Sequence, residues 1–162
     1  MDRSSPVTAL LAARAVRDFG DGFVAVLLPV HLTLLGFSAV EVGVMATAAL
    51  LGSSVLTLGI GALGNRHDHR RLLIAAAGLM VASGVAFAFV HDFALLLVIA
   101  FVGTINPSSG SVSIFAPLEQ TVLTAASADR GRTAMFARYS LVGALAGAVG
   151  ALAAAVPDIL AP

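Results

Sequence analysis

The sequence predicts an all-α bundle of helices that cross a membrane, and three observations lead to that prediction. Of its 162 residues, 59% are hydrophobic and only 11% are charged, whereas a soluble domain is about half apolar and a quarter charged. The mean hydropathy is +0.99. The basic residues stand in three short clusters separated by long apolar stretches. Because one crossing takes about 20 apolar residues, the chain has room for roughly five or six.

The basic clusters set the expected number and direction of the crossings. Stretches 18–65 and 72–129 lack Lys and Arg and are each long enough for two spans, and the tail after the last arginine is long enough for one. Arginines mark the cytoplasmic side of a membrane protein, so a five-span chain with its N-terminus inside keeps them all on one face. The clusters are Arg3, Arg14 and Arg17; Arg66, Arg70 and Arg71; and Arg130, Arg132 and Arg138.

Local turn signals fix where the spans begin and end. Gly36 interrupts the first apolar run, and Ser38 with Glu41 has the spacing of a capping box, which predicts a helix start there. Asp92 interrupts a later apolar run and is suited to cap the helix that follows. The expected spans are about 15–35, 40–63, 72–90, 93–116 and 133–156, with cytoplasmic loops at 64–71 and 117–132.

The fourth span is expected to be irregular. Residues 106–110 and Pro117 interrupt its apolar character, which predicts a kinked or broken helix. A straight helix over 93–126 would exceed the bilayer thickness, so residues 117–129 are expected to form a helical extension at the inner surface.

The loop between the second and third spans carries a family resemblance. Residues 61–71 read Gly-Ala-Leu-Gly-Asn-Arg-His-Asp-His-Arg-Arg, which resembles the loop signature of the major facilitator superfamily, roughly G-x-L-A-D-R-x-G-R-R. The turn at 35–43 is similar to that family's first external turn. Gly61, Leu63, Arg66 and Arg70 match the signature, whereas Asn65 stands at its acidic position.

The resemblance implies secondary transport of a small solute. Family members usually carry twelve spans in two six-helix halves, so this chain looks like an N-terminal half that lacks the sixth helix. A missing C-terminal half or a second copy, as a homodimer, is then the expected partner. Because Asn65 is neutral, the charge-assisted contact that the family's acidic residue makes with the opposite half is in doubt here.

Charged residues of the first span are the main candidates for a site. Arg14, Asp18 and Asp21 share one helix face, with Arg17 close to it. Ionisable groups within a membrane mark ion or substrate pathways, which makes Asp18 and Asp21 candidates and Asp21 the best one for sensing a proton or cation. Alternatively, Arg14–Asp18 and Arg17–Asp21 pair at i,i+4 and only neutralise the helix end. His31 is a weaker candidate, since a histidine there is more often an interfacial polar residue.

Polar residues of the fourth span form a second candidate group. On an ideal helix they fall within one sector that would line a central cavity, although such side chains also hold helices together by hydrogen bonds. Glu119 lies on another side and is expected, with Gln120, near the inner mouth. The sector contains Asn106, Ser109, Ser113 and Gln120.

Small residues of the fifth span predict close helix packing. Gly143 and Gly147 have the G-x-x-x-G spacing, which suits contact either within the chain or between copies.

Several classes of function are disfavoured by the residues that the chain lacks. It has no cysteine, and the two histidines of the loop at 67–69 lack a third ligand, so no metal and no cofactor is expected. Zero net charge gives no basic face for nucleic acid. No nucleophile, base and orienting group converge, which argues against an enzyme.

The expected location is the cytoplasmic (plasma) membrane, surrounded by lipid. Arginine-only basic residues and abundant alanine are typical of a GC-rich bacterial genome, which would make it a bacterial inner membrane. The alternative function is a membrane module that does not transport, or a truncated gene product, and that packs against another membrane protein.

Overall fold

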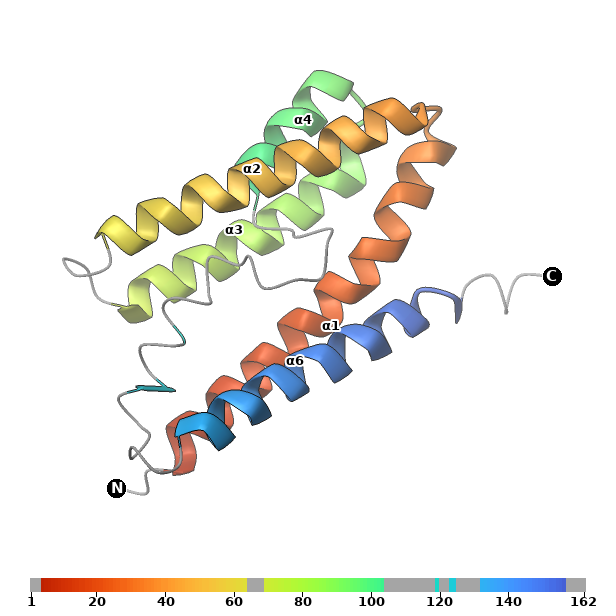
Figure 1. The fold of residues 1–162 in the computed structure, drawn as a ribbon. Coiled ribbons are helices and arrows are strands. Elements are labelled where there is room, and N and C mark those ends of the chain that lie inside the picture. The colour runs from red at the N-terminus through yellow and green to blue at the C-terminus, as the bar shows by residue number, and fades with distance from the viewer. Residues whose placement is uncertain (1–3, 64–68, 104–118, 120–122, 125–131, 157–162) are drawn as a thin grey trace. The chain divides into compact units, whose positions relative to one another are not determined.

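A computed structural model of the chain describes residues 4–63, 69–103, 119, 123–124 and 132–156. Within these ranges the regular structure is entirely α-helical (Figure 1), which confirms the predicted fold class. The helices are α1 (Ser4–Leu34), α2 (Ala39–Leu63), α3 (His69–Phe89), α4 (Phe93–Val102) and α6 (Arg132–Ala153).

Three of these helices contain a stretch long and apolar enough to cross a membrane: Ala39–Gly59, Arg71–Phe89 and Thr133–Ala153. Over its described part α4 is also apolar, but it is shorter than a span. With 31 residues, α1 is long enough to cross, yet charged residues interrupt its apolar character. The count of five crossings therefore stays a prediction.

The chain divides into two compact units. One contains α1 up to Leu27 together with Glu119, residues 123–124 and α6; the other contains the end of α1 from Leu28 together with α2, α3 and α4. Each unit is described by itself below.

In the second unit, the turn from α1 to α2 forms as the sequence predicts. Gly36 has a φ of 91°, a left-handed conformation that glycine adopts without strain. The amide of Phe37 donates to the carbonyl of Leu32 (3.2 Å) and that of Gly36 to Thr33 (3.0 Å), which is the Schellman pattern of a helix end. The next helix starts at the capping box: the Ser38 amide donates to Glu41 Oε2 (2.8 Å) and the Glu41 amide to Ser38 Oγ (3.3 Å).

The predicted cap of α4 is also confirmed. Asp92 is the N-cap residue, and its Oδ1 accepts a hydrogen bond from the Leu95 amide (3.0 Å). This bond satisfies one of the amides that the first turn of a helix leaves free.

Glycine permits α2 and α4 to approach closely. A Cβ added at Gly52 would overlap the backbone carbonyl of Phe101 in α4. One helical turn further along α2, Leu56 packs against the buried Ala76 of α3. Both contacts hold α2 between its neighbours without using any charged group.

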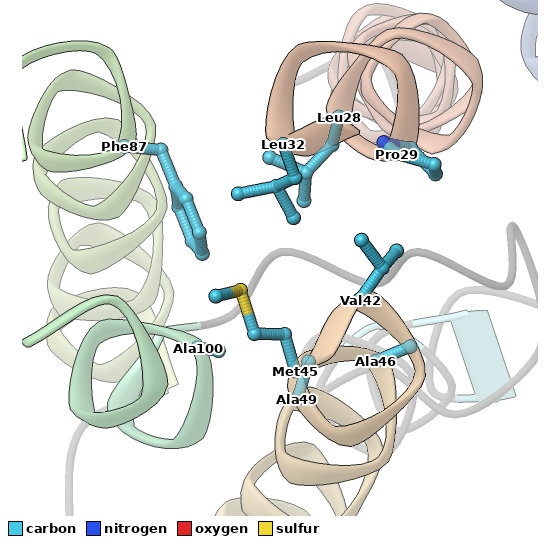
Figure 2. Close-up of a pocket in the computed structure, with 9 residues that line it drawn as sticks. All are labelled: Leu28, Pro29, Leu32, Val42, Met45, Ala46, Ala49, Phe87 and Ala100. Atoms are coloured by element: carbon cyan, nitrogen blue, oxygen red, sulfur yellow. The ribbon is translucent and has the colours of Figure 1, made fainter. Parts of the chain in front are cut away.

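A small cavity of about 30 Å³ lies among the four helices of this unit (Figure 2). All nine side chains that line it are apolar, and Met45 and Leu32 point into it in Figure 2. Its lining consists of Leu28, Pro29, Leu32, Val42, Met45, Ala46, Ala49, Phe87 and Ala100.

The close approach at Gly52 leads to a test of the α2–α4 packing. We expect Gly52→Ala to destabilise the protein by about 1–3 kcal/mol, because the new methyl group must displace the backbone of α4. The measurement is unfolding of the purified protein in mixed micelles. Gly43→Ala is the matched control on the same helix, since a Cβ there meets nothing within 4 Å. Equal effects of the two substitutions would contradict the packing described here.

Candidate functional site

The charged residues of α1 lie together in the first unit, as their helical spacing requires. Arg14 Nε is 3.0 Å from Asp18 Oδ2, so the predicted i,i+4 pair forms. Arg17 Nε is 3.6 Å from Asp18 Oδ1. One carboxylate of α1 is thus shared between two guanidinium groups.

Glu119 joins these residues from a distant part of the sequence. Arg17 donates to both of its carboxylate oxygens, from Nη1 to Oε1 at 2.6 Å and from Nη2 to Oε2 at 3.1 Å. The residue Glu119 is only 1% exposed. A bidentate pair of this type is among the stronger interactions in proteins, and here it connects α1 with the segment that precedes α6.

Tyr139 of α6 completes the group. Its hydroxyl donates to Glu119 Oε2 and accepts a hydrogen bond of 2.5 Å from Arg14 Nη1. The Arg14 guanidinium carbon also lies 4.2 Å from the centre of the Tyr139 ring, in a cation–π contact. We call Arg14, Arg17, Asp18, Glu119 and Tyr139 the ionic cluster.

The charges of the ionic cluster cancel. Its two arginines face two carboxylates, which limits the large desolvation cost of burying ions. The predicted pair between Arg17 and Asp21 is wrong, because Arg17 binds Glu119 and Asp18 instead. Asp21 forms no ion pair with the described residues, and its Oδ1 is buried without a hydrogen-bond partner there.

The glycines of α6 lie directly against α1. A Cβ at Gly143 would collide with Asp18 Oδ2 and Arg14 Nε, and one at Gly150 would collide with the backbone of Phe19. Gly147 approaches α1 so closely that a Cβ on Gly22 would overlap its carbonyl. The small-residue face of α6 is therefore covered by α1 of the same chain, and Gly143 lies in direct contact with the ionic cluster.

Other predicted site residues lie elsewhere. His31 belongs to the second unit, where its Nε2 is buried and has no hydrogen-bond partner among the described residues. The last turn of α2 contains Gly61 and Leu63, and the first turn of α3 contains Arg70. Asn65, Arg66, Asn106, Ser109, Ser113 and Gln120 lie outside the described residues.

Sequence reasoning missed Tyr139 and the partner of Glu119. The sequence did offer one signal for Tyr139, because it is the chain's single tyrosine and stands one helical turn before Gly143, on the same helix face. Nothing in the sequence indicated that Glu119 binds Arg17, since 102 positions separate them.

An all-helical chain with several membrane-capable helices and a buried, charge-balanced cluster belongs to the integral membrane proteins. The sequence model of the Major Facilitator Superfamily matches residues 10–156. The chain belongs to that superfamily, whose general activity is transport across a membrane.

The chain is also similar to an uncharacterized membrane protein of Saccharomyces cerevisiae, YJR124C. The two are 28% identical over 149 residues, which is 92% of this chain and 33% of the yeast protein. The chain thus spans about a third of the length of this curated relative. No solved structure matches the chain significantly.

The hydroxyl of Tyr139 provides a test of the ionic cluster. We expect Tyr139→Phe to lower the free energy of unfolding by about 1.5–3 kcal/mol, because hydrogen bonds to charged groups are lost while the ring stays in place. Unfolding in mixed micelles measures the change. Ser140→Ala, at the exposed neighbouring position, is the control and should have little effect. A Tyr139→Phe protein as stable as the control would refute the hydroxyl's role.

Proposed function

We propose that this chain takes part in secondary active transport of a small solute, as one portion of a major-facilitator carrier. The main support for this proposal is the arrangement of charged side chains around Asp21. A neutral ionic cluster occupies every charge of α1 near it, and Asp21 is left as the surplus carboxylate. Ionisable side chains within membrane helices are costly and mark pathways for ions or substrates.

Asp21 is the proposed binding group for a coupling proton or cation. Its carboxylate lies on the same helix face as Arg14 and Asp18, and the charged groups that act on it are Asp18, Arg17 and Arg14. Unlike Asp18 and Glu119, it has no arginine bound to it within the part of the chain that the structure describes. A proton or a small cation is therefore the charge best suited to neutralise it.

Transport by this proposal requires a second half or a second copy. Carriers of this kind move two halves against each other around a site near the middle of the membrane, and the chain spans only part of its yeast relative. Because α1 covers the glycine face of α6, we favour a separate half over a dimer formed across Gly143 and Gly147.

The proposed location is the cytoplasmic membrane, with the N-terminus inside. The nine arginines support this orientation because they fall on a single side of the five-span arrangement. The arginine and alanine content supports a bacterial inner membrane. The polar residues of the fourth span, from Asn106 to Gln120, remain the proposed lining of the solute pathway.

Proton coupling through Asp21 can be tested in proteoliposomes that contain the chain with its partner half. A pH-sensitive dye inside the vesicles records proton movement while a library of sugars, amino acids and organic ions is added outside. We expect one solute class to trigger proton flux, and we expect Asp21→Asn to abolish it because the neutral amide cannot bind a proton. Asp92→Asn, which affects an exposed helix cap, is the control and should keep the flux.

Two results would count against the proposal. Unchanged flux and pH dependence in Asp21→Asn would remove Asp21 from the pathway. No flux with any solute, from a chain that assembles neither with a second copy nor with a separate half, would favour the alternative of a non-transporting membrane module.

A further inference from the structure

Arg17 pairs with Glu119 and also contacts Asp18, and a third carboxylate, that of Asp21, follows one helical turn further along α1. Glu119 accepts two hydrogen bonds from it, at 2.6 and 3.1 Å. Asp21 follows Arg17 by four positions on α1, and side chains at that spacing are neighbours about 5–6 Å apart at Cβ. Rotation of the flexible arginine side chain would bring its guanidinium from Glu119 to Asp21 without moving the helix.

The cluster contains a group that can take over Glu119 if Arg17 leaves. Arg14 Nη1 is already 3.8 Å from Glu119 Oε2, and it donates to the same Tyr139 hydroxyl that donates to Glu119. A small shift of Arg14 would therefore keep Glu119 from becoming an unpaired buried ion, which is the costly state.

The protonation state of Asp21 sets the charge balance, and the charge balance determines whether Arg17 is better placed on Glu119 or on Asp21. Among the described residues, the charged groups that act on Asp21 are Arg14, Arg17 and Asp18 of α1, and the two arginines in turn contact Glu119 and Tyr139. With Asp21 neutral, two arginines match two carboxylates. With Asp21 ionised, three carboxylates share two arginines, and the buried Oδ1 that lacks a partner needs a donor.

We propose that Glu119 is a positioning residue that controls proton binding at Asp21 by competing with it for Arg17. When Asp21 carries a proton, Arg17 stays on Glu119 and holds this residue against α1. When Asp21 releases the proton to water, its carboxylate draws Arg17 away and Glu119 is held only through Arg14 and Tyr139. This inference rests on the proposed function, because it assigns a control to the same proton-binding carboxyl group.

Infrared difference spectroscopy of the full chain in phospholipid nanodiscs tests the competition without any transported solute. The signal of protonated Asp21 is the carboxylic acid band that disappears in Asp21→Asn. In Glu119→Gln, Arg17 loses its charged competitor and can bind Asp21. We therefore expect the midpoint of that band to move to lower pH by about one unit or more, the usual effect of an opposite charge nearby.

The chain offers a matched control, because its only other glutamate is Glu41, which belongs to a helix cap in the second unit. Glu41→Gln should leave the midpoint unchanged. A band that titrates in the wild-type chain but does not move in Glu119→Gln would overturn the competition while leaving Asp21 as a proton site. Absence of the band at every pH would overturn both ideas, whereas a shifted midpoint without solute flux would refute transport alone.

A second measurement uses the wild-type cluster and so does not depend on a Glu119 variant that folds. Because the chain lacks cysteine, spin labels can be placed at Thr124→Cys and Ala137→Cys, both at exposed positions. We expect the distance distribution between them to broaden as the pH rises through the titration of Asp21, and to stay constant in Asp21→Asn. A distribution that ignores pH in both proteins would contradict the release of Glu119.

Discussion

The bidentate ion pair between Arg17 and Glu119 is the interaction on which the first unit depends. A guanidinium group on a helix within an apolar bundle must find a counter-charge, because a bare buried ion costs several kcal/mol. Arg14 and Arg17 share Asp18 on α1, and the bidentate partner of Arg17 comes from 102 positions away. Two residues of α6 support this pair. The Tyr139 hydroxyl donates a further hydrogen bond to Glu119, and Gly143 leaves room for the Arg14 side chain.

The two units are held together by different kinds of residue. In the second unit α2, α3 and α4 pack through apolar side chains and through glycine at Gly52. Its buried serine Ser83 bonds back to the carbonyl of Leu79 in its own helix, so it needs no partner from another helix. The first unit instead concentrates charge. The proposed proton or cation site therefore lies in the first unit, whereas α2 and α3 of the second unit are apolar enough to cross a membrane.

The features that could be predicted from the sequence are those set by residues close together in the chain. The Ser38–Glu41 capping box, the Asp92 cap and the Arg14–Asp18 pair each join residues three or four positions apart, so helix geometry alone specifies them. The Arg17–Asp21 pair was predicted on the same ground and is wrong, since a stronger partner arrives from elsewhere in the fold. The contacts of Tyr139 and Glu119 with α1 could not be predicted. The apolar pattern of a helix shows which of its faces is buried, but not which other helix packs against that face.

The proposed role of the chain rests on its membership of the Major Facilitator Superfamily and on the ionic cluster. The central structural claim is the pairing of Arg17 and Glu119. A double-mutant cycle in mixed micelles measures it most directly, with Arg17→Met and Glu119→Leu made singly and together. The account predicts that each single substitution lowers the free energy of unfolding by about 1.5–3 kcal/mol, since it removes charge-assisted hydrogen bonds between buried groups, and that the double substitution costs less than the two combined. Simple additivity of the two losses would contradict it.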